Sequence, residues 1–323
     1  MMKKRCKLLV FISLLLILGI GAPSCISADS QLLGQLQDQL QSSSGLPRRQ
    51  AARKLLELGP EATATVLILL GDADTVIRRN AYRSLRQRLD FEAIPFYKKG
   101  LQDESPLVRM VIVEELMAYQ PRSQELMALL RQAAGDPDNE VRKLAAGAFW
   151  SFHRDYLPIR KRPNWDHAIE ILQRQALPLD TWLFRPDPGR IGHMEEWFAP
   201  QLDTSSWYAS VIGKWWHQAL PEKVGHFEGV AWYRLEFTAP TAPNEEFNEA
   251  VLHFAAVDES TWVWVNGHYA GEHDLGTSGW DAPFDIEVGS FLRWGEKNQL
   301  SIRVLNASGA GGIYKPVELQ ILK

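Results

Sequence analysis

Two hydrophobic periodicities divide the chain into a helical first half and a β-rich second half. In the first half, apolar residues recur at the three- and four-residue spacing of an amphipathic helix, as at Leu126, Leu129, Leu130 and Ala133. In the second half, apolar and polar residues alternate along short runs such as 233–238, which is typical of strands with one buried face. The pattern therefore predicts a multidomain α + β chain, with helices first and an antiparallel β-sandwich second.

The helical half repeats itself. In three units, an acidic residue is followed six positions later by an Arg that comes directly after a branched apolar residue. The acidic positions are Asp72, Asp103 and Asp136, and a weaker copy begins at Ser42, so successive units are 30, 31 and 33 residues apart. Each unit predicts two helices joined by a polar turn, because neither helix can bury its apolar face alone. Stacking of neighbouring pairs closes a continuous core and predicts an α-solenoid.

Over residues 31–155, this pattern resembles HEAT-type repeats of the short, roughly 30-residue kind. The resemblance implies a structural ladder of charged side chains between neighbouring repeats. Its residues here are Asp72, Asp103 and Asp136 with Arg78, Arg109 and Arg142. The competing interpretation is that these are exposed charges, which contribute little individually. Ser42 departs from the pattern, so the first repeat is expected to be a cap. Solenoids of this kind bind partners on a concave face, which implies a protein partner.

The β-rich half shows a recognisable order of motifs. A Trp-containing strand ends in Asn266-Gly267, a two-residue hairpin turn in which both residues tolerate positive φ. Further motifs lie at 229–234, 283–286, 295–300 and 311–314. In order and spacing, residues 180–323 resemble the amino-terminal sugar-binding jelly roll of glycoside hydrolase family 2, a galactose-binding-like fold. The resemblance implies a glycan ligand.

The same resemblance implies that the chain is not an enzyme. In that family the catalytic acid and nucleophile lie on a separate (β/α)-barrel, which takes about 250 further residues, whereas the sequence ends at Lys323. The neighbouring glutamates at 195–196 and 245–246 are interpreted as solvated loop residues rather than as a catalytic pair. The eight His show no zinc-binding spacing, so no metal or other cofactor is expected.

Composition and charge change near residue 155. All twelve Trp lie at Trp150 or later, and residues 156–323 carry 14 basic and 22 acidic side chains. An acidic half argues against nucleic-acid binding, which needs clustered Lys and Arg. We therefore expect a repeat domain over 29–155 and a sandwich over 191–323. The connector between them, 156–190, could form one more helix over 165–176.

The start of the chain predicts export from a bacterial cell. Four basic residues among the first seven precede an apolar run over 8–20, and small residues follow. This is the order of a secretory signal peptide, expected over residues 1–28. The apolar run is shorter than a membrane-spanning helix needs. One alternative stays open, in which Cys25 is a lipidated first residue that anchors the protein to a membrane. Either way, the folded protein is expected in the periplasm or outside the cell.

A sugar site needs an exposed aromatic platform beside a few carboxylate, amide or imidazole groups, because sugars have flat apolar faces and many hydroxyls. The segment after the Asn266-Gly267 hairpin supplies that mixture on a glycine-containing loop. The candidates there are His273, Asp274, Trp280 and Asp281, with Trp215, Trp216 and Tyr314 as second contributors from other loops. The alternative is that Trp280 plugs the end of the sandwich and Asp281 caps a turn.

These observations predict an exported, non-catalytic protein that binds carbohydrate through its sandwich and docks a protein on its solenoid. An alternative function also fits them. The chain would then be an accessory subunit or structural scaffold of a glycoside hydrolase system, with a sandwich that no longer binds sugar.

Overall fold

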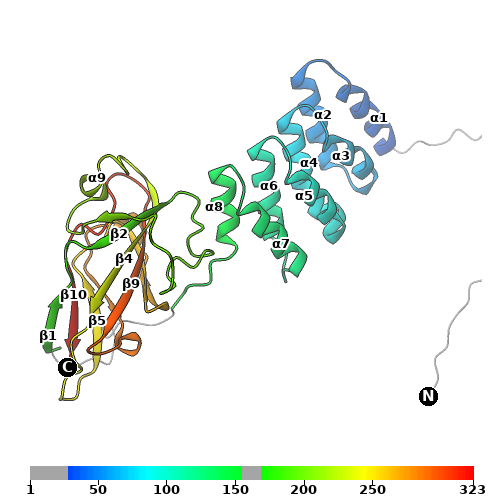
Figure 1. The fold of residues 1–323 in the computed structure, drawn as a ribbon. Helices are drawn as coiled ribbons and strands as arrows, with labels where there is room; N and C mark the ends of the chain where they lie inside the picture. Colours follow the sequence, from blue (N-terminus) through cyan, green and yellow to red (C-terminus); the bar gives the residue numbers. More distant parts are fainter. Residues whose placement is uncertain (1–27, 155–168) are drawn as a thin grey trace, which may run out of the picture. The chain divides into compact units, whose positions relative to one another are not determined.

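The computed structural model describes residues 28–154 and 169–323 (Figure 1). Residues 1–27 of the expected signal peptide, which include Cys25, and residues 165–168 of the expected connector helix lie outside these ranges. The backbone divides into two compact units, of which the first ends at Ala81 and the second begins at Tyr82. Within the two described ranges, every helix is too short or too polar to cross a bilayer.

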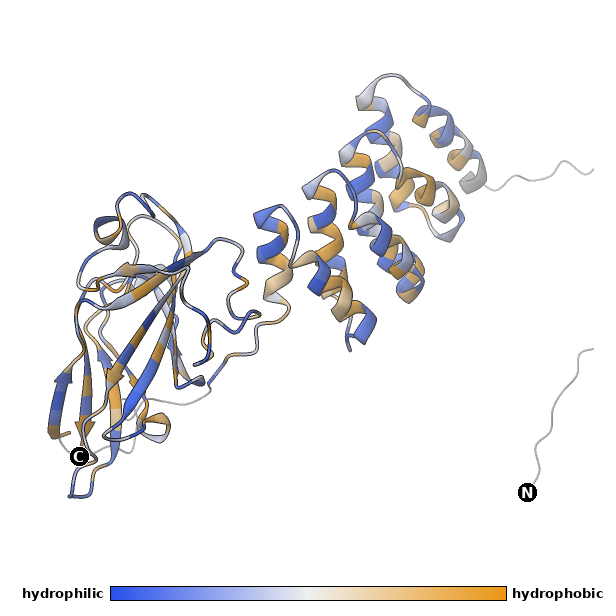
Figure 2. Cartoon of the chain, viewed as in Figure 1, coloured by the Kyte–Doolittle hydropathy of each residue, from blue (hydrophilic) through white to orange (hydrophobic). Residues whose placement is uncertain are grey.

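Helices fill the described part of the first half and follow one another in pairs, as the repeat predicts. The helices are α1 (Ala28–Leu40), α2 (Gly45–Glu57), α3 (Thr63–Leu69), α4 (Thr75–Leu89), α5 (Ile94–Gly100), α6 (Pro106–Met117), α7 (Gln124–Ala133) and α8 (Asn139–Gly147). Short 3₁₀ turns, η1 (Pro60–Ala62) and η2 (Asp90–Ala93), precede α3 and α5. Figure 2 shows helices that carry hydrophobic and hydrophilic residues on different sides. The predicted helical repeat is confirmed.

Local chemistry starts the helices where the repeat register requires. The Ser123 hydroxyl caps α7 by accepting from the Leu126 amide at 3.3 Å. The Asp138 carboxylate caps α8 by accepting from the Glu140 amide at 2.9 Å. Apolar positions that recur in the second helices are then fully buried, at Leu55, Leu85 and Leu116. Capping therefore fixes the starts of α7 and α8, and the apolar stripes supply the packing.

The second half is a sandwich of two antiparallel sheets, as the alternation predicts. The four-stranded sheet has the order β1-β10-β5-β8, and the six-stranded sheet has the order β3-β2-β4-β9-β6-β7. The strands are β1 (Ile171–Ala176), β2 (Trp182–Asp187), β3 (Tyr208–Ser210), β4 (Gly229–Thr238), β5 (Glu249–Phe254), β6 (Ser260–Val265), β7 (His268–His273), β8 (Phe284–Glu287), β9 (Lys297–Asn306) and β10 (Val317–Leu322). The connections include helix α9 (Trp216–Ala219) and the 3₁₀ turns η4 (Gly276–Gly279) and η5 (Gly289–Phe291).

The range expected as a connector holds two strands of the sandwich. Residues 171–176 form β1, which pairs with β10, so the helix expected over 165–176 is wrong for these residues. The second strand in the range, β2, pairs with both β3 and β4. The physical reason is that sheet pairing overrides a weak local helical pattern, because strand formation depends on neighbouring strands.

A second aromatic core covers the outer face of the six-stranded sheet. It contains Trp232, Trp262 and Trp264, and Trp150 and Phe152, which follow α8, pack against it. The guanidinium of Arg303 on β9 lies 4.6 Å from the ring centroid of Trp150 and 4.5 Å from that of Trp262. Burial lowers the pKa of Arg303 to about 10, so the group stays charged at neutral pH. The two indole rings therefore hold a buried cation.

His193 lies in the same region and is buried. Its Nε2 is 3.1 Å from the main-chain oxygen of Ala146, and its ring centroid is 5.1 Å from that of Trp150. Burial, together with the nearby charge of Arg303, lowers the pKa of His193 from 6.5 to about 4. The folded chain therefore keeps this imidazole neutral at pH values where the unfolded chain protonates it.

This shift predicts an acid-sensitive stability. Between pH 6.5 and about 4, the unfolded state binds more protons at His193, so the free energy of unfolding falls as the pH falls. The expected slope from this group is about 1.4 kcal/mol per pH unit. Urea unfolding at several pH values would measure it, with His193→Gln as the comparison, since all other groups cancel between the two proteins. Equal slopes for the two proteins would contradict the prediction.

Candidate functional site

Three loops at one end of the sandwich bring three aromatic side chains together. Tyr314, between β9 and β10, stacks on Trp215, with ring centroids 3.8 Å apart and planes 18° apart. Trp280, directly after η4, lies with its ring centroid 6.5 Å from that of Tyr314, also at 18°. We call Trp215, Tyr314 and Trp280 the aromatic stack. The structure therefore unites three of the candidates, although they are far apart in the sequence.

Main-chain hydrogen bonds hold the Trp215 loop to the Tyr314 loop. The Gly213 amide donates to the Ile313 oxygen at 2.9 Å, and the Trp216 amide donates to the Gly311 oxygen at 2.9 Å. Gly311 allows this approach because a Cβ there would lie 2.2 Å from the Trp216 ring. The stacked pair of rings thus depends on a residue without a side chain.

Trp280 is placed by contacts of its own backbone. Its main-chain oxygen accepts from the Tyr314 hydroxyl at 2.9 Å. The turn before it packs closely, since a Cβ on Gly279 would lie 2.9 Å from the main-chain oxygen of Glu259. Half of the Trp280 surface is exposed. A plug at the end of the sandwich would be buried, so this exposure contradicts the plug interpretation and leaves an aromatic surface open to solvent.

Polar groups surround the aromatic stack. Asp281 Oδ1 lies 2.9 Å from the Tyr314 hydroxyl and forms an ion pair with Lys315. The Lys315 ammonium, followed by the Tyr314 hydroxyl, holds the pKa of Asp281 below its usual range. Asp274, which begins the loop that leads to Trp280, accepts from the Ser260 hydroxyl at 2.6 Å. Ionised carboxylates with such partners are suited to accept hydrogen bonds from hydroxyl groups.

Two further carboxylates belong to this end of the sandwich, and the sequence analysis did not single them out. Asp258 bridges to Gly312 through its main chain, with its amide donating to the Gly312 oxygen at 3.1 Å. Burial, and then the charge of Glu259, raise the pKa of Asp258 to about 7. Glu259 Oε2 accepts from the Ala307 amide at 2.8 Å. The sequence signal for them was a pair of adjacent acidic residues between two strands. That signal was not enough to place them at the site, because Asp258 pairs with Gly312 of the Tyr314 loop, which is distant in the sequence.

Two candidates do not reach the surface. Trp216 is 1% exposed and belongs to the core between the sheets, because it packs over Gly311 and against Phe184. His273 is 8% exposed, and its ring lies flat on Phe284, with centroids 4.1 Å apart. Both expectations of a sugar-contacting side chain are therefore wrong. Trp216 supports the neighbouring loop instead, and His273 is part of the packing at the end of β7.

The charged positions of the repeat form two kinds of contact. Arg109 forms a bidentate ion pair with Asp136 of the next repeat, with Nε–Oδ2 2.7 Å and Nη2–Oδ1 2.8 Å. Arg48, in the weaker first copy, pairs with Asp72 of the repeat that follows it. The repeat Arg residues also donate to the main-chain oxygens of their own turns. The donor–acceptor pairs are Arg78 to Asp72 O, Arg109 to Asp103 O and Arg142 to Asp136 O. The guanidinium groups thus satisfy turn carbonyls and, where a carboxylate follows, link neighbouring repeats.

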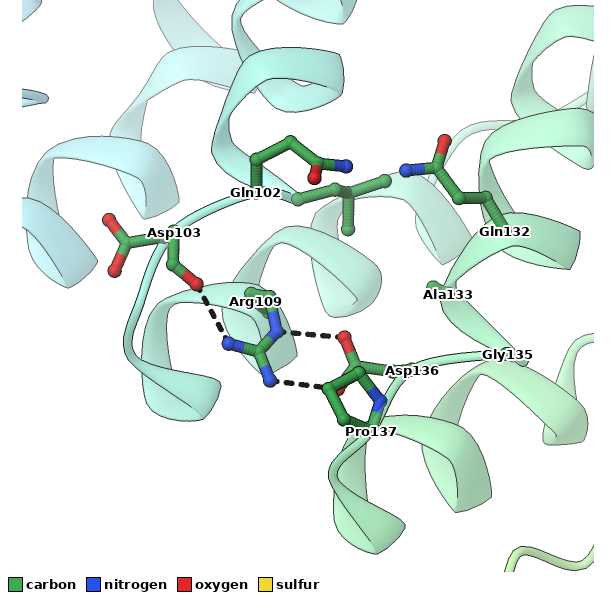
Figure 3. A pocket seen from close by; sticks show the side chains of 9 residues that line it. Gln102, Asp103, Arg109, Gln132, Ala133, Gly135, Asp136 and Pro137 are labelled. Atoms are coloured by element: carbon green, nitrogen blue, oxygen red, sulfur yellow. Dashed lines mark hydrogen bonds and ion pairs between the residues drawn. The ribbon is translucent and has the colours of Figure 1, made fainter.

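A hollow of about 330 Å³ lies beside the Arg109–Asp136 pair (Figure 3). Gln102 and Gln132 contribute amide groups to its lining, and Pro137 lies next to Asp136. The ladder residues therefore also form part of the cavity wall. Within residues 28–154 and 169–323, no three His, Cys, Asp or Glu side chains are grouped so that they could hold a metal ion.

Comparison with known families separates the helical part of the chain from the β-rich part. Residues 33–117 and 64–149 match HEAT repeats. Residues 181–315 match the family described as glycosyl hydrolases family 2, sugar binding domain. No curated protein matches the chain.

Several solved structures are similar over about half of the chain. A β-glucuronidase from Ruminococcus gnavus is 18% identical, with a TM-score of 0.40 and coverage of 48% of this chain and 30% of that one. A Bacteroides uniformis β-glucuronidase is 25% identical, with a TM-score of 0.36 and coverage of 46% of this chain and 18% of that one. A glycosyl hydrolase family 2 member from Bacteroides cellulosilyticus is 23% identical, with a TM-score of 0.37 and coverage of 46% of this chain and 21% of that one. The chain thus spans less than a third of the length of each. By its two family matches, the chain is similar to HEAT repeats in its helical part and to the glycosyl hydrolase family 2 sugar-binding domain in its β-sandwich.

Proposed function

We propose that this chain is a non-catalytic glycan-binding protein whose sandwich binds carbohydrate at the aromatic stack. The observation that carries the proposal is the half-exposed Trp280 beside the Asp281 carboxylate and the Tyr314 ring. The apolar face of a sugar ring can cover an indole, while its hydroxyls donate to carboxylate oxygens. The match to a sugar-binding domain over the same residues supports this assignment.

Three of the four carboxylates at this end have partners that suit binding, and the fourth, Asp258, has the raised pKa that a proton donor would need. Asp281 is engaged by Lys315 and Tyr314, Asp274 by Ser260, and Glu259 by an amide. A glycosidase needs a pair of carboxyl groups on either side of the scissile bond, one of them free to donate a proton. The match to a sugar-binding domain over this region supports a binding role.

We further propose that the repeats dock a protein partner and that the mature protein is exported. Stacked helical repeats present extended surfaces, which suits protein docking. The support for export is the charged, apolar and small-residue order of the first 28 residues. Membrane attachment would require lipidation of Cys25.

Replacing Trp280 with alanine tests the proposed sugar surface. A glycan array should first identify a ligand for the full mature chain, and titration calorimetry should then show at least about a tenfold loss of affinity in Trp280→Ala. The melting temperature should barely change, because the removed ring is half-exposed.

Tyr208→Ala is the matched control. Tyr208 is also an exposed aromatic, at 37%, but it lies on the edge strand β3 and outside the aromatic stack. It should retain full affinity. The proposal fails if Trp280→Ala binds as well as the unaltered protein, or if the unaltered protein binds no glycan on the array. The second result favours the scaffold or accessory-subunit alternative.

A further inference from the structure

An ammonium group of the chain itself already occupies a cation position at the aromatic stack. The Lys315 ammonium pairs with Asp281 and lies 5.5 Å from the centroid of the Tyr314 ring. A carboxylate beside an aromatic face is a combination that binds ammonium groups, through charge and through the cation–π interaction. The two side chains are 39% and 49% exposed, so the pair is solvated and weak. A ligand can therefore compete with Lys315 for this position.

Acidic residues outnumber lysines in the loops at this end of the sandwich. Segments 212–216, 255–260, 274–281 and 309–315 contain four acidic residues and two lysines. Because the pKa of Asp258 is raised to about 7, that carboxyl is mostly protonated at pH 6, and the remaining formal charge is −1. The carboxylates are Asp258, Glu259, Asp274 and Asp281, and the lysines are Lys214 and Lys315. Burial raises the pKa of the Tyr314 hydroxyl, and the nearby carboxylates of Asp281 and Asp258 raise it further. A cationic ligand would thus be attracted to the aromatic stack.

An acidic sugar would be repelled by the same carboxylates. A uronate or sulfate group placed against Trp280 would face Asp281, and Lys315 would have to leave its carboxylate to meet the ligand. Juxtaposed like charges disfavour binding and so contribute to specificity. A neutral sugar gains the aromatic contact but no ionic contact. The charges therefore rank the three sugar classes, with cationic first and acidic last.

We propose that the aromatic stack selects glycans that carry protonated amino groups, with the ligand ammonium replacing that of Lys315 at Asp281. This inference rests on the proposed glycan-binding function and adds the ligand class to it. Trp280 supplies the exposed aromatic face, Asp281 supplies the counter-charge, and Lys315 is an internal competitor for the same carboxylate.

The test compares three oligosaccharides on the full mature chain by titration calorimetry. The probes are a glucosamine tetramer, the matching N-acetylglucosamine tetramer and a galacturonate tetramer, at about pH 6, where the amines are protonated and the uronates ionised. The glucosamine tetramer should bind about tenfold more tightly than its N-acetylated counterpart. The galacturonate tetramer should bind most weakly. The preference should shrink at high ionic strength, because these charges are partly exposed.

Two variants should move this preference in opposite directions. Asp281→Asn should weaken binding of both tetramers, because both lose a hydroxyl acceptor, but it should weaken binding of the amine tetramer about tenfold more, so that the preference disappears. Lys315→Met frees Asp281 and should strengthen binding of the amine tetramer severalfold without helping the N-acetylated one. The matched control is Glu245→Gln, which breaks an exposed pair of the same kind, with Lys323 Nζ 2.9 Å from Glu245 Oε2. Glu245 lies outside the four loop segments, so this variant should leave the preference intact.

The outcomes separate the inference from the function on which it rests. Equal affinities for the amine and N-acetylated tetramers, or tightest binding of the galacturonate tetramer, overturn the ligand class but leave glycan binding in place. An unchanged preference in Asp281→Asn also overturns it, provided that the variant melts at the same temperature as the unaltered protein. Failure of all three probes, together with a silent glycan array, overturns both proposals.

Discussion

Replacing Arg109 with alanine is expected to lower the free energy of unfolding by about 3–5 kcal/mol. The guanidinium forms two hydrogen bonds with the Asp136 carboxylate, and the two side chains are only 10% and 7% exposed. Removal of Arg109 would leave the buried carboxylate without its counter-charge and one turn carbonyl, on Asp103, without that donor. Urea unfolding followed by circular dichroism of the helices measures the change.

Arg83→Ala is the matched control for this prediction. Arg83 also forms an Arg–carboxylate pair between helices, with its Nη2 2.7 Å from Glu114 Oε2. That pair is 52% and 45% exposed, so its loss should cost less than about 1 kcal/mol. If the two variants were equally destabilised, burial would not be the reason that the Arg109 pair matters. Replacing both Arg109 and Asp136 with leucine should recover part of the lost stability, because no charge then remains buried.

Trp216→Ala is expected to cost a similar amount, about 3–5 kcal/mol, because it removes a fully buried ring. Trp216 is 1% exposed and packs against Phe184 and Phe227, with ring centroids 6.0 and 5.6 Å away. The cavity would lie directly beneath the Trp215 loop. Thermal and urea unfolding of the full chain would measure the loss.

The neighbouring residue provides the control. Trp215 is only partly buried, and its ring stacks on Tyr314 at the surface end of the same loop. Trp215→Ala should therefore change stability much less than Trp216→Ala, while weakening glycan binding. If Trp216→Ala melted normally and Trp215→Ala unfolded, the assignment of one ring to the core and the other to the surface would be reversed.

The repeat could be predicted from sequence because its signal is local and recurs. Each Arg lies six residues after an acidic or polar marker, and the same offset places its guanidinium against the turn carbonyl of its own repeat. The alternating strands could be predicted for the same reason. By contrast, β1 lacks a clear alternation and exists because β10 offers it a partner.

The candidate surface could be predicted only in part, because its members come from distant loops. Trp280, Tyr314 and Trp215 were recognisable as aromatic residues in loops. Adjacent residues such as Trp215 and Trp216 cannot be sorted into surface and core by residue type, since the sorting depends on the approach of Gly311. Lys315 and Asp258 were missed because their importance comes from pairing with Asp281 and with Gly312, respectively.

The buried Arg303 has a practical consequence for dissecting the chain. Its guanidinium lies between the rings of Trp150 and Trp262, and Trp150 precedes the composition change near residue 155. A sandwich fragment that starts at residue 156 would lack one of these two rings and would expose both the cation and the Trp262 face to water. A fragment intended for ligand studies should therefore begin upstream of Trp150. Proteolysis that aims to release the sandwich would meet the same requirement.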